Sequence, residues 1–381
     1  MQHLPPLSLY IHIPWCVRKC PYCDFNSHEK TADFACNEKA YVDALLRDLE
    51  HSRQLSGQHK LESLFFGGGT PSLFSAESIQ RIIRHAASLF MIDDAEITLE
   101  ANPGTFEQAK FAAYHDVGIN RLSIGIQSFN NHHLQSLGRI HDAKQAYSAI
   151  NMAKQAGFEN INLDIMFGLP QQSIQQAVDD IRVAIEHQVN HISHYQLTIE
   201  PNTYFHKHQP VLPDPDNLWA MQTQCQQQLD AACFQQYEVS AYAKSRKQCQ
   251  HNLNYWLFGD YIGIGAGAHS KLTASHTQQI TRYWKHRQPE AYMTSIHSTG
   301  AIAGKKRLTK NDTSFEFLLN ALRLKQGCKP AVFNQHTGLS LEQLQQYCKT
   351  VDTDLLTINS HTICTTDRGF RFLNELLEQL L

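Results

Sequence analysis

His12-Ile13-Pro14-Trp15-Cys16-Val17-Arg18-Lys19-Cys20-Pro21-Tyr22-Cys23-Asp24-Phe25 is the stretch that decides the fold and the chemistry of this chain. Its three cysteines lie so close in sequence that a single loop can bring their thiols together. A cubane iron–sulfur cluster normally takes four cysteine thiolates. Three thiolates leave the fourth iron open to a ligand from outside the protein, so this stretch predicts a cluster that binds a small molecule.

The residues around the triad favour ligation over packing. Residues 8–14 form a short apolar and β-branched run that predicts a strand, which Pro14 ends, and Pro21 keeps the next segment out of a helix. A zinc site, a disulfide and unpaired core cysteines are the alternatives. Zinc sites usually draw on paired Cys-x-x-Cys or histidine partners, and the chain has no second Cys-x-x-Cys.

The spacing Cys-x-x-x-Cys-x-x-Cys resembles the cluster motif of the radical S-adenosylmethionine (SAM) superfamily. The resemblance implies a 4Fe-4S cluster on Cys16, Cys20 and Cys23, whose free iron chelates the amino and carboxylate groups of the methionine part of SAM. Tyr22 matches the family position that packs near the adenine. Reductive cleavage of SAM to a deoxyadenosyl radical is the usual consequence in that superfamily.

Composition limits the classes of protein to consider. The 381 residues are 42% hydrophobic with a formal net charge of −3, enough for a large core in two or three units and without the basic excess typical of nucleic-acid binding. No run approaches the roughly 18 apolar residues of a membrane span, and residues 1–6 do not resemble an export signal. The other cysteines are scattered. We therefore expect a cytoplasmic protein whose clustered cysteines bind metal.

Strand-like runs alternate with helical patterns over the first 200 residues, which predicts βαβ units and a parallel sheet. The expected strands cover residues 8–14, 61–66, 95–101, 121–129, 160–167 and 191–199, with helices near 38–52 and 76–90. Six units predict an α/β fold in the form of a curved, partial (β/α)6 barrel. Functional residues of such folds gather at the C-terminal ends of the strands.

The chain is expected to divide into three parts. Residues 1–200 form the radical SAM partial barrel, 201–303 complete it, and 304–381 form a small module. Residues 304–307 are interpreted as a linker. Helices at 314–324 and 341–348, a hairpin at 355–365 and a final helix then predict a winged-helix-like α+β module. Because the module has no concentrated basic face, a lid or packing role is favoured over nucleic-acid binding.

Glycines follow the second expected strand in Gly67-Gly68-Gly69-Thr70-Pro71. Glycine permits positive φ angles and close approach of backbone to a ligand, although a tight turn uses glycines as well. Because it occurs together with the cysteine triad, the segment resembles the radical SAM glycine motif that binds the methionine amino group of SAM. Gly68, Gly69 and Thr70 are therefore candidate SAM contacts.

Polar residues interrupt three of the apolar strands, namely Glu100, Gln127 and Asp164. Burying such a group without a partner costs about 1–3 kcal/mol, so each should meet a ligand or an internal hydrogen-bond network. Their repeated position near the same end of successive strands favours a shared ligand. Arg139 can pair with a carboxylate in fork geometry, with a surface salt bridge as the alternative.

Further motifs make the resemblance specific: Tyr-Ile-His-Ile-Pro-Trp-Cys, Gly-Gly-Gly-Thr-Pro, Glu-Ala-Asn-Pro, Gly-Ile-Gln-Ser-Phe, Leu-Gly-Arg and Asp-Ile-Met-Phe-Gly-Leu-Pro. Together they resemble the oxygen-independent coproporphyrinogen III oxidase group over most of the chain. The resemblance implies a SAM site lined by Tyr10, Tyr22, Gly68, Gly69, Thr70, Glu100, Gln127, Arg139 and Asp164. The chain departs from the oxidase itself at Phe25, where those enzymes have a fourth cysteine, and in lacking their longer N-terminal arm.

A second motif, Gln250-His251-Asn252-Leu253-Asn254-Tyr255-Trp256, matches the His-Asn-x-x-Tyr-Trp signature of heme-binding members of this group. Histidine is a suitable axial ligand of heme iron, and aromatic rings pack on porphyrin faces. Alternatively, His251 and Asn252 cap a turn while Tyr255 and Trp256 fill the core. The resemblance implies heme contacts from His251, Asn252, Tyr255 and Trp256, with His251 as the leading one.

We therefore expect a heme chaperone that binds heme and transfers it to acceptor hemoproteins, with SAM on the open iron of a 4Fe-4S cluster and without coproporphyrinogen oxidase activity. The alternative is the oxidase, which converts coproporphyrinogen III to protoporphyrinogen IX by two decarboxylations and which Phe25 argues against. A third option is another radical SAM reaction. Heme and acceptor hemoproteins are the expected partners, without nucleic acid or a membrane span, and peripheral contact with membrane hemoproteins stays open.

Overall fold

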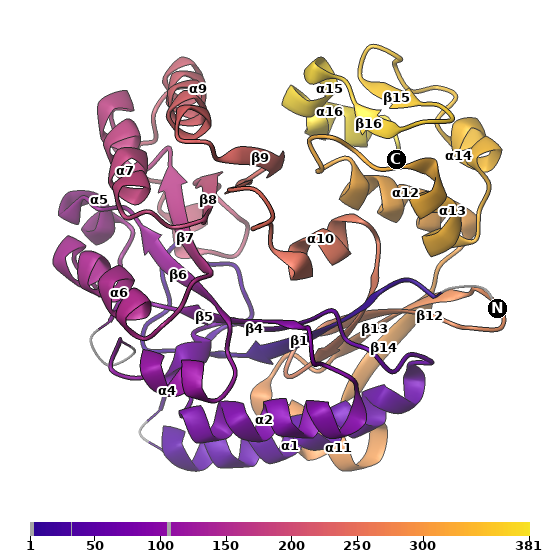
Figure 1. Ribbon diagram of the computed structural model, residues 1–381, viewed down its shortest axis with the longest axis horizontal. Coiled ribbons are helices and arrows are strands. Elements are labelled where there is room, and N and C mark those ends of the chain that lie inside the picture. The colour runs from indigo at the N-terminus through magenta and orange to yellow at the C-terminus, as the bar shows by residue number, and fades with distance from the viewer. Residues whose placement is uncertain (1–3, 32, 105–107) are drawn as a thin grey trace.

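The computed structural model describes residues 4–31, 33–104 and 108–381. Residues 1–3 belong to the segment 1–6 that was compared with export signals above, and they lie outside the described residues. One twelve-stranded sheet runs through the described chain in the order β14-β13-β12-β11-β1-β4-β5-β6-β7-β8-β10-β9 (Figure 1). Its centre consists of parallel strands in chain order: β1 (Leu7–Ile13), β4 (Ser63–Gly68), β5 (Glu96–Ala101), β6 (Arg121–Gln127), β7 (Ile161–Phe167) and β8 (His191–Gln196).

Strict alternation along these strands builds the core on one face of the sheet. Successive side chains of a strand point to opposite faces, and Leu64 and Phe66 of β4 are buried in the main apolar cluster with Leu99 of β5 and Leu163 of β7. Most of the residues between them are polar or small, with the aromatic rings of Tyr10 and Phe65 as exceptions. The sheet therefore has an apolar outer face under the helices and a polar concave face.

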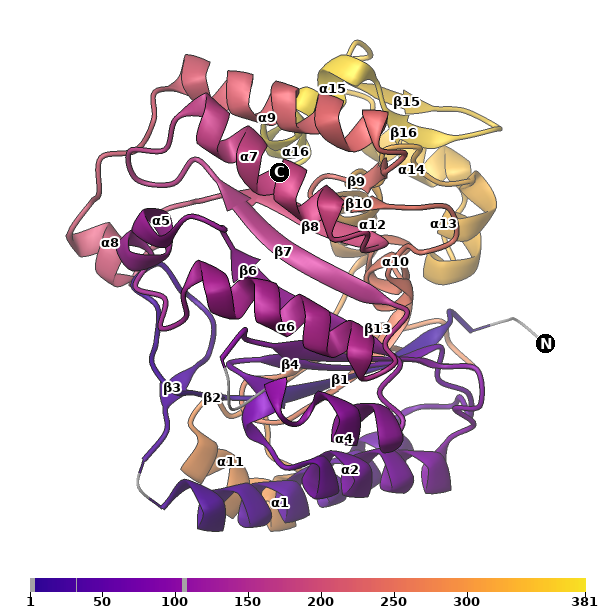
Figure 2. The ribbon, with the colours of Figure 1, turned by 60° about the vertical axis from the view of Figure 1, so that its left-hand side comes forward.

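Helices cover the outer face, as expected for βαβ units (Figure 2). They are α1 (Phe34–Leu55), α2 (Ala76–Leu89), α4 (Phe111–Asp116), α5 (Asn131–Ser136), α6 (Ala143–Gln155) and α7 (Ile174–Glu186). Helix α9 (Pro215–Ala231) packs along α7. The partial barrel predicted from six strand–helix units is confirmed, although the second strand ends at Gly68 rather than Phe66, so two of the three glycines lie inside it.

The other half of the sheet is mostly antiparallel. β11 (Asp260–Ile264) pairs with β1 in parallel, and β12 (His269–Thr273), β13 (Ile280–Lys285) and β14 (Ile302–Arg307) continue it as a meander. The predicted linker at 304–307 is wrong, because these residues form most of edge strand β14. On the far side, β10 (Ala241–Ala243) and β9 (Gln235–Glu238) extend the sheet beyond β8.

Two buried ion pairs brace the antiparallel half. Lys271 Nζ lies 2.7 Å from Asp260 Oδ1, and Lys285 donates to Asp48 of α1. Tyr292 of α11 (Pro289–Thr299) also donates to Asp48, at 2.8 Å. The pairing of each buried charge compensates for part of its desolvation, so these contacts fix the meander and α11 against the barrel.

The C-terminal module follows the sheet in the chain (Figure 1). Its apolar core includes Phe317, Phe333, Leu344 and Ile363 and is joined by Phe258 and Ile280 from the preceding part of the chain. It contains α12 (Lys310–Ala321), α13 (Pro330–Thr337), α14 (Leu341–Tyr347), the hairpin β15 (Leu356–Ile358) and β16 (Ile363–Thr365), α15 (Asp367–Arg371) and α16 (Leu373–Glu378). Helix α13, with proline at its first position, was not anticipated. No described helix combines the length and the apolar character needed to cross a membrane.

Candidate functional site

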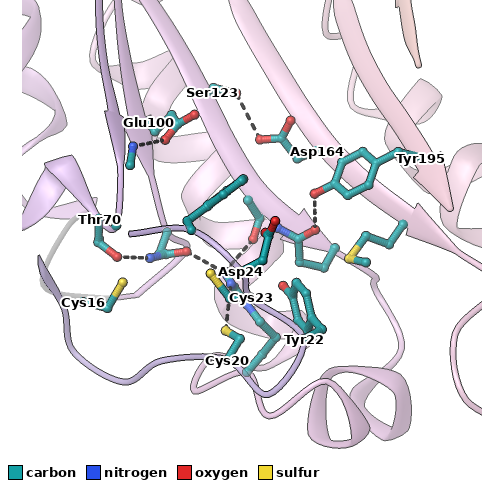
Figure 3. Close-up of a pocket in the computed structure, with 18 of the residues that line it drawn as sticks. Cys16, Cys20, Tyr22, Cys23, Asp24, Thr70, Glu100, Ser123, Asp164 and Tyr195 are labelled. Atoms are coloured by element: carbon teal, nitrogen blue, oxygen red, sulfur yellow. Dashed lines mark hydrogen bonds between the residues drawn. The ribbon is translucent and has the colours of Figure 1, made fainter. Parts of the chain in front are cut away.

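The cysteine loop begins where β1 ends, at the C-terminal edge of the parallel strands. Backbone hydrogen bonds tie its base together, from His28 N–H to the Pro14 carbonyl at 2.7 Å and from Lys30 N–H to the Cys16 carbonyl at 2.9 Å. All three thiols are partly exposed and line one cavity of about 490 Å³ (Figure 3). Burial raises the pKa of the Cys16 and Cys23 thiols.

The three thiols share one cavity but do not form a site for a single metal ion in the described part of the chain. Among the described residues, no three His, Cys, Asp or Glu side chains surround a single point as one ion requires. In a cubane cluster each cysteine binds a different iron, so the sulfurs stand apart around a larger group. Arg139 Nη1 donates to Cys20 Sγ at 3.5 Å, which places a cation beside the thiols. The loop and its cavity therefore suit a cluster that carries negative charge.

Gly68 and Gly69 are required by the loop above them. A Cβ on Gly68 would lie 2.6 Å from the His12 ring, and one on Gly69 would lie 2.5 Å from the Trp15 carbonyl oxygen; Gly68 also has a φ of +118°. The Gly68 N–H donates to Glu100 Oε2 at 3.1 Å. The glycines thus let the cysteine loop lie directly on β4, and they line the cavity together with Thr70.

Glu100 and Asp164 face the concave interior, and neither has a cation in hydrogen-bonding contact among the residues that the structure describes. Burial, with the nearby Asp164 charge as a second cause, raises the pKa of Glu100 to about 8. Burial likewise raises the pKa of Asp164, which accepts hydrogen bonds from Ser123 at 3.0 Å and Asn162 at 2.9 Å. With this pKa Glu100 holds its proton at neutral pH, and both carboxyl groups ionise more readily when a cationic ligand arrives.

Gln127 and Arg139 complete the cavity through contacts between strands. Gln127 is buried with a left-handed φ of 65°, and its Oε1 accepts from the Tyr195 hydroxyl at 2.9 Å. Arg139 donates to the Gly125 carbonyl at 3.0 Å and to Asn102, whose Nδ2 donates to Thr70 Oγ1 at 2.9 Å. One network therefore joins the glycine segment to the fourth parallel strand.

Every predicted SAM-site residue except Tyr10 lines this cavity. Tyr10 lies instead in two smaller neighbouring cavities and donates to His12 Nδ1 at 2.9 Å. The sequence interpretation missed Asn102, Ser123 and Tyr195, which also line the large cavity. The two-residue alternation on β6 and β8 places Ser123 and Tyr195 on the polar face, so periodicity was the available signal.

The heme-motif residues lie on α10 (Gln250–Trp256), which packs against the concave face near β1, β4 and β11 (Figure 1). His251 is only 2% exposed, and its ring stacks on Phe65 at 4.8 Å and meets Tyr255 edge-on at 5.0 Å. His251, Asn252 and Tyr255 line a chamber of about 250 Å³. Trp256 does not; its ring lies under the Arg323 guanidinium at 4.4 Å.

The hydrogen bonds of His251 define its tautomer. The Ser63 hydroxyl donates to Ser8 Oγ at 2.8 Å, so the 2.8 Å contact between His251 Nδ1 and Ser63 Oγ assigns the proton to Nδ1. Within the described chain Nε2 has no hydrogen-bond partner. Burial, with Arg121 as a second cause, lowers the pKa of His251 to about 3. The ring is therefore neutral and keeps a free lone pair on Nε2.

The large cavity and the chamber under α10 share a wall made of Glu100, Ser123, Asp164 and Ser193. These residues lie on four neighbouring parallel strands, β5 to β8. The cysteine loop and the heme-motif helix thus flank the same concave polar surface.

Comparison with known proteins agrees with this architecture. Residues 10–184 match the radical SAM superfamily and residues 308–372 match the HemN C-terminal domain. The fold is similar to the solved coproporphyrinogen III oxidase HemN of Escherichia coli, described as a radical SAM enzyme, with a TM-score of 0.82 and 22% identity, covering 99% of this chain and 90% of that one.

Closer in sequence are two curated heme chaperones named HemW. The Haemophilus influenzae protein is 49% identical over 387 residues, covering 100% of this chain and 99% of the relative. The Escherichia coli protein is 46% identical over 383 residues, covering 100% of both chains. With this identity along its whole length, and with the cysteine loop and α10 arranged around one concave surface, the chain belongs to the HemW family of heme chaperones within the radical SAM superfamily.

Proposed function

We propose that this protein binds heme through α10 and its surroundings and passes it to acceptor hemoproteins, while its cysteine loop carries a 4Fe-4S cluster with SAM. The observation that carries the proposal is the full-length identity of 49% and 46% to the HemW heme chaperones. The neutral His251 with its free Nε2 supports it from within the chain.

In this proposal Cys16, Cys20 and Cys23 hold the cluster, which supplies one-electron chemistry when reduced. SAM would bring its cationic sulfonium group into a cavity where Glu100 and Asp164 have raised pKa values, while its amino group, as an iron ligand, would be unprotonated. Ionisation of these carboxyl groups against the incoming cation compensates for their burial. Tyr22, Gly68, Gly69, Thr70, Gln127 and Arg139 complete the proposed SAM site in the cavity, with Tyr10 behind it.

Heme contact is proposed for His251, Asn252, Tyr255 and Trp256. The test is a hemin titration of anaerobically reconstituted protein, followed by the Soret absorption. We expect His251→Ala to weaken hemin binding and shift the Soret band. An unchanged spectrum and affinity in this variant would contradict the role of His251 as an iron ligand.

His194→Ala is a matched control for His251→Ala. His194 is also buried, stacks on Phe167 at 4.6 Å, lacks a hydrogen-bond partner at Nε2 within the described chain, and has its pKa lowered to about 3 by burial. It does not line the chamber under α10. Loss of packing alone would affect the two variants alike, whereas loss of an iron contact affects only His251→Ala.

Coproporphyrinogen oxidase activity is the competing function, because the fold matches that of HemN. Phe25, at the position of the fourth cysteine in the oxidases, is 61% exposed beside the triad. We expect no protoporphyrinogen from coproporphyrinogen III in an anaerobic assay with SAM and a reductant. Its formation at a sustained rate would replace the chaperone proposal by the oxidase.

The remaining expectations stay proposals. We place the protein in the cytoplasm, with heme and acceptor hemoproteins as partners, and divide it at 1–200, 201–303 and 304–381. The second apolar cluster supports the last division because most of its residues lie in 304–381, although Phe258 and Ile280 also belong to it and the sheet continues to Arg307 through β14.

A further inference from the structure

A third cavity, of about 320 Å³, lies between the cysteine loop and α10. It shares Phe25, Gly68 and Glu100 with the large cavity, and Tyr10, Glu100 and Tyr255 with the chamber under α10. Its outer wall comes from the meander, through Tyr261 of β11 and His269 of β12.

The walls of this cavity are aromatic. Tyr255 and Tyr261 meet edge-on with ring centroids 4.4 Å apart, and the exposed Phe25 ring lies on the cysteine-loop side. Aromatic faces bury large areas of flat apolar ligands. The composition of the wall therefore fits a planar macrocycle better than a small polar ligand.

His269 brings an available imidazole to the same cavity. The residue is exposed, and within the described chain its ring nitrogens have no hydrogen-bond partner; the ring packs beside Trp284 at 6.4 Å. Partial burial, followed by the charges of Arg282 and Arg287, lowers the pKa of His269. Its imidazole is therefore mostly neutral at neutral pH, the form that binds metals.

A cation stands near this imidazole. Arg282 forms an ion pair with Glu316 of α12. The exposed Arg287 has no ion pair among the described residues. The Arg287 carbonyl accepts a hydrogen bond at 2.8 Å from Asn26 Nδ2, and Asn26 lines the cavity. A guanidinium in this position suits a carboxylate at the rim of a bound ligand.

We propose that heme lies in this cavity, with its ring against Phe25, Tyr255 and Tyr261, that His269 is an axial ligand of its iron, and that Arg287 pairs with a propionate. The inference rests on the proposed heme-chaperone function and adds residues of β11, β12 and the cysteine loop to Tyr255 of α10. His251 does not line this cavity, so in this placement it supports the Tyr255 ring, which it meets at 5.0 Å, and His269 takes the place of His251 as the iron ligand. Iron binding here forms one bond from an imidazole nitrogen lone pair to the iron, with no redox step.

The sizes of the cavities support this placement. Pockets that enclose drug-sized ligands span about 300–1,000 Å³, and the chamber holding His251 has only about 250 Å³. In this placement heme contacts α10 through Tyr255, and its outer edge stays in solvent because the 320 Å³ cavity encloses only part of a macrocycle. Partial exposure suits a carrier that must release its cargo to another protein.

The test uses full-length protein with a reconstituted cluster, titrated anaerobically with hemin and, separately, with metal-free protoporphyrin IX. We expect His269→Ala to weaken hemin binding by about tenfold or more and to change the iron spin state seen by electron paramagnetic resonance. Protoporphyrin IX binding should be unchanged, since it has no iron to ligate. His276→Ala, on the exposed β12–β13 turn of the same hairpin, is the control.

Arg287→Gln should weaken hemin and protoporphyrin IX equally, because both carry propionates. If His269→Ala matched His276→Ala in hemin affinity and spin state, the assignment of His269 would be overturned while the chaperone proposal stood. If the unaltered protein bound no hemin, both would fall.

Discussion

The cavity at the cysteine loop and the chamber under α10 use the same four strands in opposite ways. In the cysteine-loop cavity the thiols, carboxyl groups and arginine face one space of about 490 Å³. The chamber has about half that volume, its histidine is buried, and Trp256 of the same motif does not line it. The difference teaches that the cysteine side offers the larger space for a cofactor, whereas a large ligand can contact only part of the α10 motif in this conformation.

The largest effect expected is on the cysteine side. Cys20→Ser removes one of three cluster ligands, and we expect almost complete loss of bound iron and sulfide after anaerobic reconstitution, measured chemically and by visible absorption. Cys36→Ser changes an exposed cysteine outside the triad and should retain both. Full iron content in Cys20→Ser would show that the cluster is held elsewhere.

The second prediction concerns the α10 side. Asp260, four residues after α10, accepts from the buried Lys271 ammonium and from Thr273. Asp260→Asn leaves that ammonium without its counter-charge, so we expect a loss of about 3–5 kcal/mol in unfolding free energy measured in urea.

The exposed pair of Arg182 and Asp179, at 2.8 Å, provides the comparison. Asp179→Asn should cost less than about 1 kcal/mol. Comparable losses in the two variants would mean that the buried pair does not brace this half of the molecule. Cluster content should stay normal in both, because neither residue touches the cysteine loop.

The shared wall gives a pH-dependent prediction. Glu100 has a pKa of about 8 in the folded protein, above the ordinary value of 4.5. The unfolded chain therefore loses this proton at lower pH than the folded protein, and the folded state loses stability as the pH rises from about 4.5 to about 8.

Glu100→Gln keeps an oxygen acceptor for Gly68 N–H and removes the titration. We expect a flatter stability profile and a gain of about 4 kcal/mol near pH 8 in the cofactor-free protein. Urea unfolding at several pH values measures this, with the exposed Glu159→Gln as control. Parallel profiles for Glu100→Gln and the unaltered protein would refute the assignment.

The smallest expected change in unfolding free energy comes from removing the Ser63 hydroxyl, which holds the His251 ring by a hydrogen bond. Ser63→Ala removes the acceptor of the His251 Nδ1 proton and the bond to Ser8, at a cost of about 1 kcal/mol in urea unfolding. Cluster content should not change. Ser88→Ala, which removes an exposed serine bond to His85, is the control; an equal cost would mean that Ser63 does not hold the ring.

Much of the barrel and the cysteine-loop cavity follows from local patterns. Glu100 and Asp164 stand out because a carboxyl group in an apolar strand needs an explanation, and strand direction then places both near the same edge. Asn102 and Tyr195 were missed because asparagine after a strand and tyrosine inside one are unremarkable locally. Only the alternation along β8 indicates that Tyr195 shares the polar face.

Other parts depend on contacts that no local pattern encodes. Residues 304–307 resemble a linker because edge strands often carry lysine and arginine, which discourage pairing with other chains; the partner strand β13 defines them as a strand. Similarly, Trp256 lies beneath Arg323 of the C-terminal module, a neighbour distant in sequence. A heptapeptide cannot reveal which of its aromatic rings a distant module will cover.

Gln127 carries a lesson for engineering. A non-glycine residue held at a positive φ costs about 1–3 kcal/mol, so a search for stabilising substitutions would rank Gln127→Gly highly. That change would also remove the acceptor of the Tyr195 hydroxyl from the wall of the cysteine-loop cavity. A thermostable variant designed on folding energy alone would therefore tend to lose its ligand site, and residue 127 should be kept fixed in any such redesign.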